Sequence, residues 1–392
     1  MTEKNTKQTK SKSKSKSKFK GLFIKSLILL NILSVISLLL SYSSVYISPA
    51  KFSFTAFFGL AYPYILLLNL FFIVVWILLR NRWLLLSLIA VLGGYSYLND
   101  FFSISFNKKE NSHEYKILSY NVRLFDIYNW GKNWSYNKTN RNKIYNYLKN
   151  ENADIICFQE YFADTLGEFS KSDSIAKITS IKNLHEHFPT KNKHHRFGIA
   201  TFSRFPIINK GLISFQKSNN LAIYTDVVIE KDTIRIYNCH LRSIHFRQED
   251  YNFVDSILNP KKEQVNSGLK LYKKLNLAFI KRAEMVDVIS QHIAKSPYPV
   301  FVCGDFNDTP VSYAYHKMLG NLKDAFCETG NGIGYTYGGI TMPFRIDYIL
   351  HSNKISTSEF ITEKIDYSDH FPIKCKFSIT QNTAARQLLP ED

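Results

Sequence analysis

The chain has 392 residues, of which 45% are hydrophobic, and a formal net charge of +18. This length corresponds to roughly two or three domains, and the apolar content is sufficient for a packed core. The cysteines are odd in number and form no C-x-x-C pair, which argues against a disulfide framework and a zinc-finger spacing. Three of them, Cys157, Cys239 and Cys303, lie in apolar strand-like runs, and we expect them to be small buried hydrophobic residues.

The first third of the chain has the composition of a membrane segment. Residues 1–20 hold eight lysines and one acid, and we expect a disordered cytoplasmic tail. Residues 21–104 contain three apolar stretches, at about 26–47, 54–79 and 83–98. Because about 20 apolar residues cross a bilayer, this segment is predicted to be a membrane domain with three transmembrane helices. The third stretch is the shortest and contains Gly93 and Gly94.

The positive charges predict the orientation of these helices. The basic tail and the turn at 80–82, which holds two arginines, should remain cytoplasmic. Three crossings then give a multi-pass protein of the plasma or inner membrane with an extracytoplasmic second part, whereas two crossings leave that part in the cytoplasm. A cleaved signal peptide is the alternative for the first stretch, although further apolar segments follow it. A transport role for the helices is disfavoured because they lack interior charge, apart from Lys25 near one end of the first stretch.

Residues 105–380 alternate short apolar runs with polar turns, and a short tail follows at 381–392. Helical periodicity occurs at 141–148 and 277–293, and this mixture predicts a layered α/β or α+β domain. The charged segment 243–275 shows no strand pattern and is a candidate lid or substrate-contact loop. Strands are predicted at 116–122, 154–158, 197–202, 222–229, 233–240, 299–303, 346–350 and 372–377.

Most of these strands end at a polar residue that is useful for chemistry. Any one of these residues is an ordinary turn or capping residue by itself. Together they supply carboxylates for a hard cation, amides and two imidazoles, and strand ends at one sheet edge are where binding sites assemble. The set comprises Asn121, Glu160, His240, Asp305 with Asn307, Asp347, and Asp369 with His370.

The order of these motifs resembles the endonuclease/exonuclease/phosphatase superfamily, which includes deoxyribonuclease I. The matching pieces are SYN at Asn121, QE at Glu160, NCH at His240, GDFN at 304–307, RIDY at 345–348 and SDHFP at 368–372. The resemblance implies a four-layer α/β/β/α sandwich, two packed β-sheets flanked by helices. It also implies a hydrolase of phosphate esters, either a phosphodiesterase or a phosphatase, that uses Mg²⁺ or Mn²⁺.

The resemblance also implies a role for each residue. Glu160, Asn121 and Asp369 are the expected metal ligands, since hard cations prefer oxygen donors. Asp305 would orient or deprotonate the attacking water, and Asn307 would hold the phosphate or the Asp305 carboxylate in place. His370 would donate a hydrogen bond to a phosphoryl oxygen, Asp347 would fix the His370 tautomer, and His240 would lie across the site.

Several questions stay open at the level of sequence. The substrate is a nucleic acid, or a phospholipid or inositol phosphate head group, and no protein partner is inferable. The alternative to an enzyme is a binding or signalling module that retains the fold without turnover. Arg123 occupies a position where some nucleases carry an acid, Arg242 is a candidate phosphate contact, and Tyr335–Tyr337 either lines the cleft or packs. Four histidines at 185–195 form either a second metal site or, more simply, a solvated loop.

Overall fold

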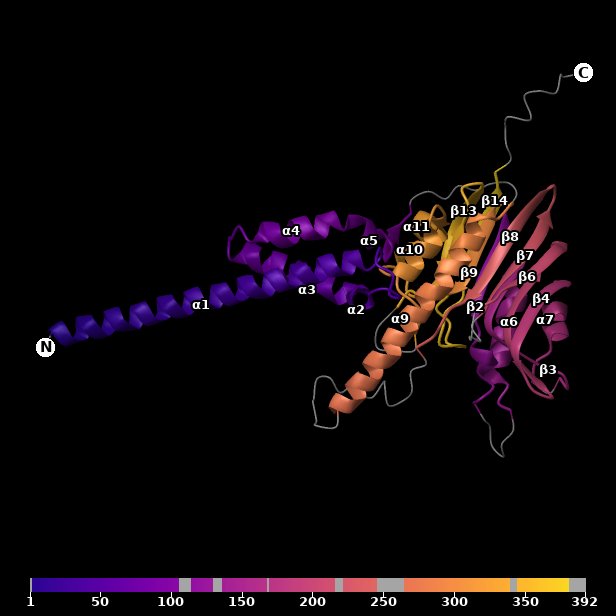
Figure 1. The fold of residues 1–392 in the computed structure, drawn as a ribbon, viewed down its shortest axis with the longest axis horizontal. Coiled ribbons are helices and arrows are strands. Elements are labelled where there is room, and N and C mark those ends of the chain that lie inside the picture. The colour runs from indigo at the N-terminus through magenta and orange to yellow at the C-terminus, as the bar shows by residue number, and fades with distance from the viewer. Residues whose placement is uncertain are drawn as a thin grey trace, which may run out of the picture.

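The computed structural model describes residues 2–105, 114–129, 136–167, 169–215, 221–244, 264–338 and 344–380. The apolar third forms a helical bundle that projects from one end of a β-sandwich (Figure 1). α3 leads away from the sandwich and α4 returns toward it, alongside α1 (Figure 1). The helices of this bundle are α1 (Thr2–Ser43), α2 (Phe54–Leu60), α3 (Tyr62–Leu78), α4 (Leu84–Gly93) and α5 (Tyr95–Asn99).

The prediction of three transmembrane helices is wrong in its count. Among the described residues, one helix is long and apolar enough to cross a membrane, at Lys20–Ser43, and a signal sequence meets the same criterion. The second predicted stretch is broken into α2 and α3, which meet at 67°, and the third yields an α4 of only ten residues. Pro63 starts a new helix at the first break and Gly94 ends α4, because proline suits a helix start and glycine a helix end.

Polar side chains join the helices in the interior of the bundle. Asn31 donates to the Ser87 hydroxyl at 2.5 Å and accepts from the Trp76 indole at 2.8 Å, while Ser87 donates to Asn69 at 3.2 Å. All four side chains are fully buried. Interhelical hydrogen bonds of this kind fix which faces of apolar helices meet, so α1, α3 and α4 form one packed unit.

The second part contains two six-stranded sheets. One has the order β10-β12-β9-β8-β7-β6 and the other β13-β14-β2-β3-β5-β4. The β2–β3 and β8–β9 pairs are parallel, and the neighbouring pairs in both sheets are antiparallel. The strands are β2 (Tyr115–Asn121), β3 (Ile155–Asp164), β4 (Asn183–Lys191), β5 (His195–Ser203), β6 (Ile207–Ile213), β7 (Leu221–Ile229), β8 (Asp232–His240), β9 (Val300–Asp305), β10 (Lys323–Asp324), β12 (Asp347–His351), β13 (Ile355–Thr362) and β14 (Ile373–Ile379).

Three apolar cores show that the sandwich has four layers. The central core lies between the sheets and includes Ile155 of one sheet and Ile236 of the other. A second core packs α6 on the β2–β3–β5 face through Ile144 and Leu148, and a third packs α9 and α10 on the β8–β9 face. The predicted α/β/β/α arrangement is therefore confirmed. Its helices are η1 (Arg123–Asp126, a 3-10 turn), α6 (Thr139–Glu151), α7 (Ser172–Thr179), α9 (Gln264–Ala294), α10 (Tyr313–Leu319) and α11 (Ala325–Thr329).

The bundle and the sandwich are joined by buried contacts. β1 (Phe102–Ile104), directly after the bundle, pairs with β11 (Asn331–Ile333) of the second part. The Arg345 guanidinium donates to the Asp100 carbonyl at 2.8 Å and also binds the Asp324 carboxylate. Val311 belongs to the apolar core of the bundle, although it follows β9 of the second part. The predicted domain boundary between residues 104 and 105 therefore separates two parts of the chain that pack against each other.

Two local predictions also need correction. The segment 243–275 is not a loop throughout, because α9 begins at Gln264; residues 245–263 lie outside the described part of the chain. The histidine-containing segment forms the β4–β5 hairpin rather than a solvated loop. His185 is buried there beside the Thr225 hydroxyl at 2.8 Å, and burial lowers its pKa to about 4. The tail at 381–392 lies outside the described residues.

Candidate active site

One edge of the sandwich gathers the polar residues that follow the predicted strands. β2 and β3 run parallel and so do β8 and β9, so their carboxyl ends lie at the same edge of each sheet. The antiparallel β12 places Asp347 beside Asp305, and His240 is also in register with Asp305. Parallel strands with a common C-terminal edge are a recurrent way to assemble a site. Residues separated by more than 200 positions in sequence thereby become neighbours.

Asp305 is the centre of this cluster. Its Oδ2 accepts hydrogen bonds from the amides of Asn121 and Asn307, each at 3.0 Å. The Nε2 atoms of His240 and His370 each lie 3.7 Å from the same oxygen. The Asp305 side chain is only 1% exposed, so these groups replace the water that would otherwise solvate it. Four predicted site residues therefore converge on one carboxylate.

Glu160 reaches this cluster through an irregularity in its strand. The pairing of β3 with β5 shifts register between Phe158 and Tyr161, and Glu160 has a φ of 47°. A β-bulge of this type turns a side chain out of the regular alternation. The Glu160 carboxylate consequently lies 3.4 Å from the Asn121 amide and 3.7 Å from His240 Nε2. It is about one-third exposed, which leaves it accessible from the edge.

His370 and Asp347 form a buried pair beside Asp305. His370 Nδ1 lies 2.9 Å from Asp347 Oδ2, and this leaves Nε2 directed toward Asp305. The Tyr337 ring packs against the imidazole with its centroid at 4.9 Å. Thr336 holds the other side of the pair, because its hydroxyl accepts from the backbone N–H of Asp347 at 3.0 Å. The His370 ring therefore has a fixed orientation and a fixed proton on Nδ1.

The pKa values of two of these groups are raised, which favours the neutral form of Asp305 and the charged form of His370. Burial raises the pKa of the Asp305 carboxyl to about 6; His370 opposes this rise and Asp347 adds to it. Burial alone would lower the pKa of His370, but the charges of Asp347 and Asp305 outweigh it and raise that pKa to about 10. His370 is therefore an imidazolium at neutral pH, with protons on both nitrogens.

The backbone around Asp305 is shaped by two unusual conformations. Gly304 has a φ of +135°, and a Cβ there would lie 2.0 Å from the Cys239 carbonyl oxygen on the parallel strand. A side chain is thus excluded by both conformation and space. Asn307 has a φ of 53°, and its N–H donates to Asp305 Oδ1 at 2.8 Å. The GDFN sequence therefore encodes a turn in which Asn307 holds the Asp305 carboxylate in position by a backbone hydrogen bond.

Asp369 lies toward the rim of the cluster. Its carboxylate is 3.6 Å from the Arg123 guanidinium, which is 57% exposed, and it accepts from the Ser368 hydroxyl at 3.3 Å. Arg123 itself sits in a turn in which 123–126 all have positive φ. The acid that some related nucleases carry at this position is replaced here by an exposed cation beside Asp369. The Arg242 carbonyl accepts a hydrogen bond from Arg282 at 2.9 Å.

Supporting residues were not anticipated from the sequence. Gln159 and Asn238 bond to each other across the two sheets at 2.8 Å, and Ser368 donates to the Asn121 carbonyl at 2.8 Å. Gln159, Asn238 and Ser368 stand inside the QE, NCH and SDH motifs, so their proximity to the predicted residues was the available signal. The only sequence signal for Thr336 was its position between two tyrosines, and nothing in the sequence linked it to Asp347.

The donor atoms of the site fit a hard divalent cation. Ligand atoms of Asp305, Asp347 and His370 lie within 4.8 Å of one another. The neighbouring carboxylates raise the pKa of His370 and so disfavour the neutral imidazole that a metal ion requires. The carboxylate oxygens of Glu160 and Asp305 match the preference of Mg²⁺ and Mn²⁺ for oxygen, and the Asn121 side chain lies between them with its amide nitrogen toward both and its oxygen toward the Arg123 N–H.

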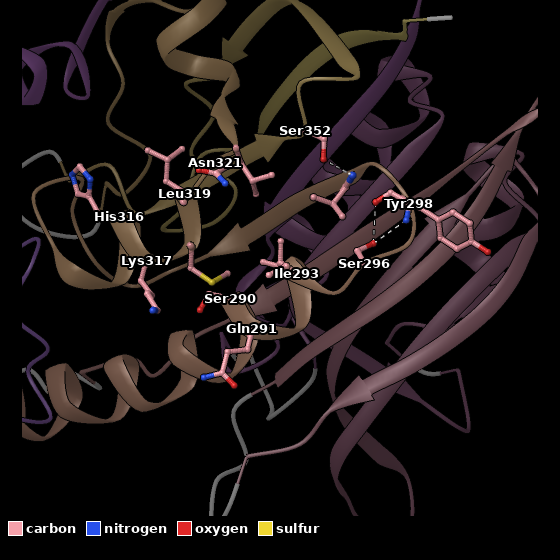
Figure 2. A pocket seen from close by; sticks show the side chains of 15 residues that line it. Ser290, Gln291, Ile293, Ser296, Tyr298, His316, Lys317, Leu319, Asn321 and Ser352 are labelled. Atoms are coloured by element: carbon pink, nitrogen blue, oxygen red, sulfur yellow. Dashed lines mark hydrogen bonds between the residues drawn. The ribbon is translucent and has the colours of Figure 1, made fainter. Parts of the chain in front are cut away.

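A cavity of about 530 Å³ lies elsewhere in the domain. It is lined by the end of α9, by α10 and by residues at the starts of β9 and the β12–β13 turn, including Ile293, His316 and Ser352 (Figure 2). Val300 at this cavity begins β9, whereas Asp305 ends it. The cavity is therefore at the opposite edge of the sheet and contains none of the predicted site residues.

The chain is similar to several solved structures. An endonuclease/exonuclease/phosphatase from Beutenbergia cavernae DSM 12333 is 12% identical, with a TM-score of 0.48 over 68% of this chain and 72% of that one. The human Nocturnin catalytic domain with bound sulfate is 18% identical, with a TM-score of 0.47 over 68% and 95%. Truncated Caenorhabditis elegans TDP2 is 18% identical, with a TM-score of 0.45 over 68% and 98%.

Family models cover both parts of the sequence. No curated protein sequence matches the chain significantly. Residues 24–101 match a domain of unknown function, DUF8431. Residues 118–370 match the model described as the Endonuclease/Exonuclease/phosphatase family, whose members are phosphoric ester hydrolases and generally depend on divalent metals. That match spans every motif of the cluster around Asp305, and the chain belongs to this family.

Proposed function

We propose that this protein is a divalent-metal-dependent hydrolase of phosphate esters that is attached to a membrane through α1. The observation that carries the hydrolase proposal is the convergence of Asn121, Glu160, His240 and His370 on Asp305 at one sheet edge. The group combines oxygen donors for a cation, a buried carboxylate and a fixed cationic imidazole. These are the components that hydrolysis of a phosphate ester requires.

The chemistry is divided among these residues. Glu160 and Asn121 would hold a Mg²⁺ or Mn²⁺ ion, which would neutralise charge on the phosphoryl oxygens when bound. Asp305 orients the attacking water and accepts its proton as the water oxygen bonds to phosphorus and the bond to the leaving oxygen breaks. Asn307 keeps the Asp305 carboxylate in position through its side-chain amide. Asp369 acts at the rim with Arg123, where the exposed guanidinium contacts a substrate phosphate or its substituent.

The two histidines act on opposite sides of the phosphorus centre in this proposal. His370 donates a hydrogen bond from Nε2 to a phosphoryl oxygen that gains charge in the transition state. Asp347 holds the proton on Nδ1 and stabilises the imidazolium. His240 lies across Asp305 and is placed to protonate the leaving oxygen. The completeness of this set favours turnover over a binding module that retains only the fold.

The proposal is tested by turnover of the full chain in detergent or lipid discs with Mg²⁺, Mn²⁺ or a chelator. The substrates are DNA, RNA, sphingomyelin and inositol phosphates, so the same panel identifies the substrate class. We expect metal-dependent hydrolysis that D305N and H370Q both abolish. D366N is the matched control, because Asp366 is exposed in the loop before His370. Full activity in D305N or H370Q would refute the assignment, and no hydrolysis of any phosphate ester would favour the inactive module.

Attachment to the membrane is supported by the surface of α1. Only 22% of the apolar window in Lys20–Ser43 is buried, whereas a helix in the core of a soluble protein would be mostly covered. We propose that the lysine-rich tail remains cytoplasmic and that α1 carries the chain across. α3 leads away from the sandwich and α4 returns, so the chain re-emerges on the side that α1 reached (Figure 1). The catalytic domain is then extracytoplasmic, which protease accessibility in intact cells and spheroplasts would test.

A further inference from the structure

Helix α9 has two unlike halves. Its C-terminal half shares a core with β8 and β9, in which Met285, Val286 and Ile289 are buried. Its N-terminal half, from Gln264 to Leu277, extends beyond the sandwich on the side where α2 and the bundle lie (Figure 1). A helix that served only to cover the sheet would end where the sheet ends. The extension therefore needs another contact surface.

The projecting half carries exposed apolar and basic side chains together. Leu269, Tyr272 and Leu277 are 55%, 48% and 50% exposed. Lys270 and Lys273 are exposed between them, and the sequence from Gln264 to Ala283 contains no Asp or Glu. Helices with apolar residues, lysines and no acids are typical of binding to the surface of an anionic bilayer.

The position of this half relative to the bundle supports the same partner. Phe57 of α2 stacks on Tyr272 with centroids 5.0 Å apart and meets Phe279 edge-on at 5.1 Å. α2 itself is bent by 67° from α3 at the junction of bundle and sandwich. Phe52 and Phe54, at the start of α2, are 54% and 51% exposed. The exposed face of α9 is thus continuous with a segment beside the helix that we propose enters the bilayer.

We infer that the N-terminal half of α9 lies on the membrane surface and binds anionic lipid head groups of the bilayer that holds α1. The inference rests on the proposed membrane attachment and is independent of the proposed hydrolysis. Leu269, Tyr272 and Leu277 enter the boundary between head groups and acyl chains. Each lysine near an anionic surface strengthens such binding about fivefold.

This contact would fix the catalytic edge relative to the membrane. Arg282 of α9 is 1% exposed and donates to Asp308 at 3.0 Å and to the Arg242 carbonyl at 2.9 Å. Asp308 follows the GDFN turn, and Arg242 follows His240 in sequence. A helix docked on lipid would therefore hold both catalytic loops at a set orientation to the bilayer surface.

The experiment uses the full chain in lipid discs of phosphatidylcholine alone or mixed equally with phosphatidylglycerol. An environment-sensitive fluorophore is attached at L269C, and V288C is the matched control, because Val288 is an exposed residue on the half of α9 that covers the sheet. Both variants carry C327S, since the other four cysteines are buried. Iodide quenching then reports access of water to the label.

We expect the label at position 269 to be protected from iodide in the anionic discs, and the label at 288 to be quenched in both. K270E with K273E should restore quenching at 269, because the equilibrium constant for docking falls at least 20-fold, about fivefold for each lysine. Equal quenching at 269 and 288 in anionic discs that retain the protein would overturn the inference and leave attachment intact. Protein that separates from the discs would instead overturn the attachment on which the inference rests.

Discussion

Replacing Asp347 by asparagine tests the electrostatic reasoning behind the site. The substitution keeps the shape of the side chain and removes the negative charge 2.9 Å from His370 Nδ1. Burial then lowers the pKa of His370, and the charges of Asp305 and Asp369 remain to oppose it. The asparagine oxygen still accepts from Nδ1–H, so the neutral imidazole has no proton left on Nε2. We expect His370 to lose its role as donor at neutral and alkaline pH.

The structure sets the size of this effect. The rise in the pKa of His370 from 6.5 to about 10 corresponds to roughly 5 kcal/mol in favour of the imidazolium, to which Asp347 is the largest favourable contributor. Loss of one preorganised donor to a developing negative charge costs about 10²–10³ in kcat. D347N should therefore be slower by about that factor at pH 8. Because the imidazolium reforms below the lowered pKa, the difference from wild type should shrink as the pH falls toward 5.

The measurement is kcat/KM against pH for a chromogenic phosphodiester at saturating Mg²⁺, with wild type and D366N in parallel. Wild type should keep a cationic His370 until the pH approaches 10, whereas D347N should lose activity at a lower pH. Thermal unfolding of each variant shows whether the fold is retained. An unchanged pH profile in a folded, slower D347N would show that the charge of Asp347 does not control His370.

Three further predictions concern the metal, the backbone and the bundle. E160Q should raise the Mg²⁺ concentration for half-maximal activity at least tenfold, because one anionic oxygen donor is lost. The measurement is activity against Mg²⁺ concentration, and an unchanged value would exclude Glu160 as a ligand. G304A should lower the free energy of unfolding by about 3 kcal/mol or more, since its Cβ would meet a backbone oxygen at 2.0 Å. Gly332 also has a positive φ, of 79°, but has open space around it, so G332A should cost no more than about 1 kcal/mol. Equal losses of the two variants in denaturant titrations would refute the steric argument. N31L should lower the free energy of unfolding of the chain in detergent by about 1 kcal/mol or more, because Trp76 of α3 and Ser87 of α4 lose their hydrogen bonds to Asn31. An unchanged melting temperature would show that this network does not stabilise the bundle.

The residues of the cluster around Asp305 were predictable because family motifs keep them next to strand ends. SYN, QE, NCH, GDFN, RIDY and SDHFP each attach a polar residue to an apolar run, and the alternation of such runs indicates sheets. The composition also located the apolar third, since long apolar stretches differ from any strand of the sandwich. The number of helices was not predictable in this way, because hydropathy does not register the breaks at Pro63 and Gly94.

The supporting contacts depend on distances that no local pattern contains. Thr336 and Asp347 are neighbours only because the chain before β12 folds back across the edge, and Gln159 reaches Asn238 only because the sheets pack face to face. The same applies to helix α9. The sequence pattern of its charged first half predicted a loop, and only the contact with Phe57 placed this half beside the bundle.

The sequence by itself determined which polar side chains follow the strands and where the apolar third lies, because composition and strand-end motifs are local properties of the chain. Tertiary structure alone decided that Asp305 is the common partner of Asn121, Asn307, His240 and His370. The physical reason is that the protonation of a buried group and its capacity to bind a cation depend on which charges and dipoles lie within a few ångströms. Parallel strand pairing and the packing of two sheets set those distances.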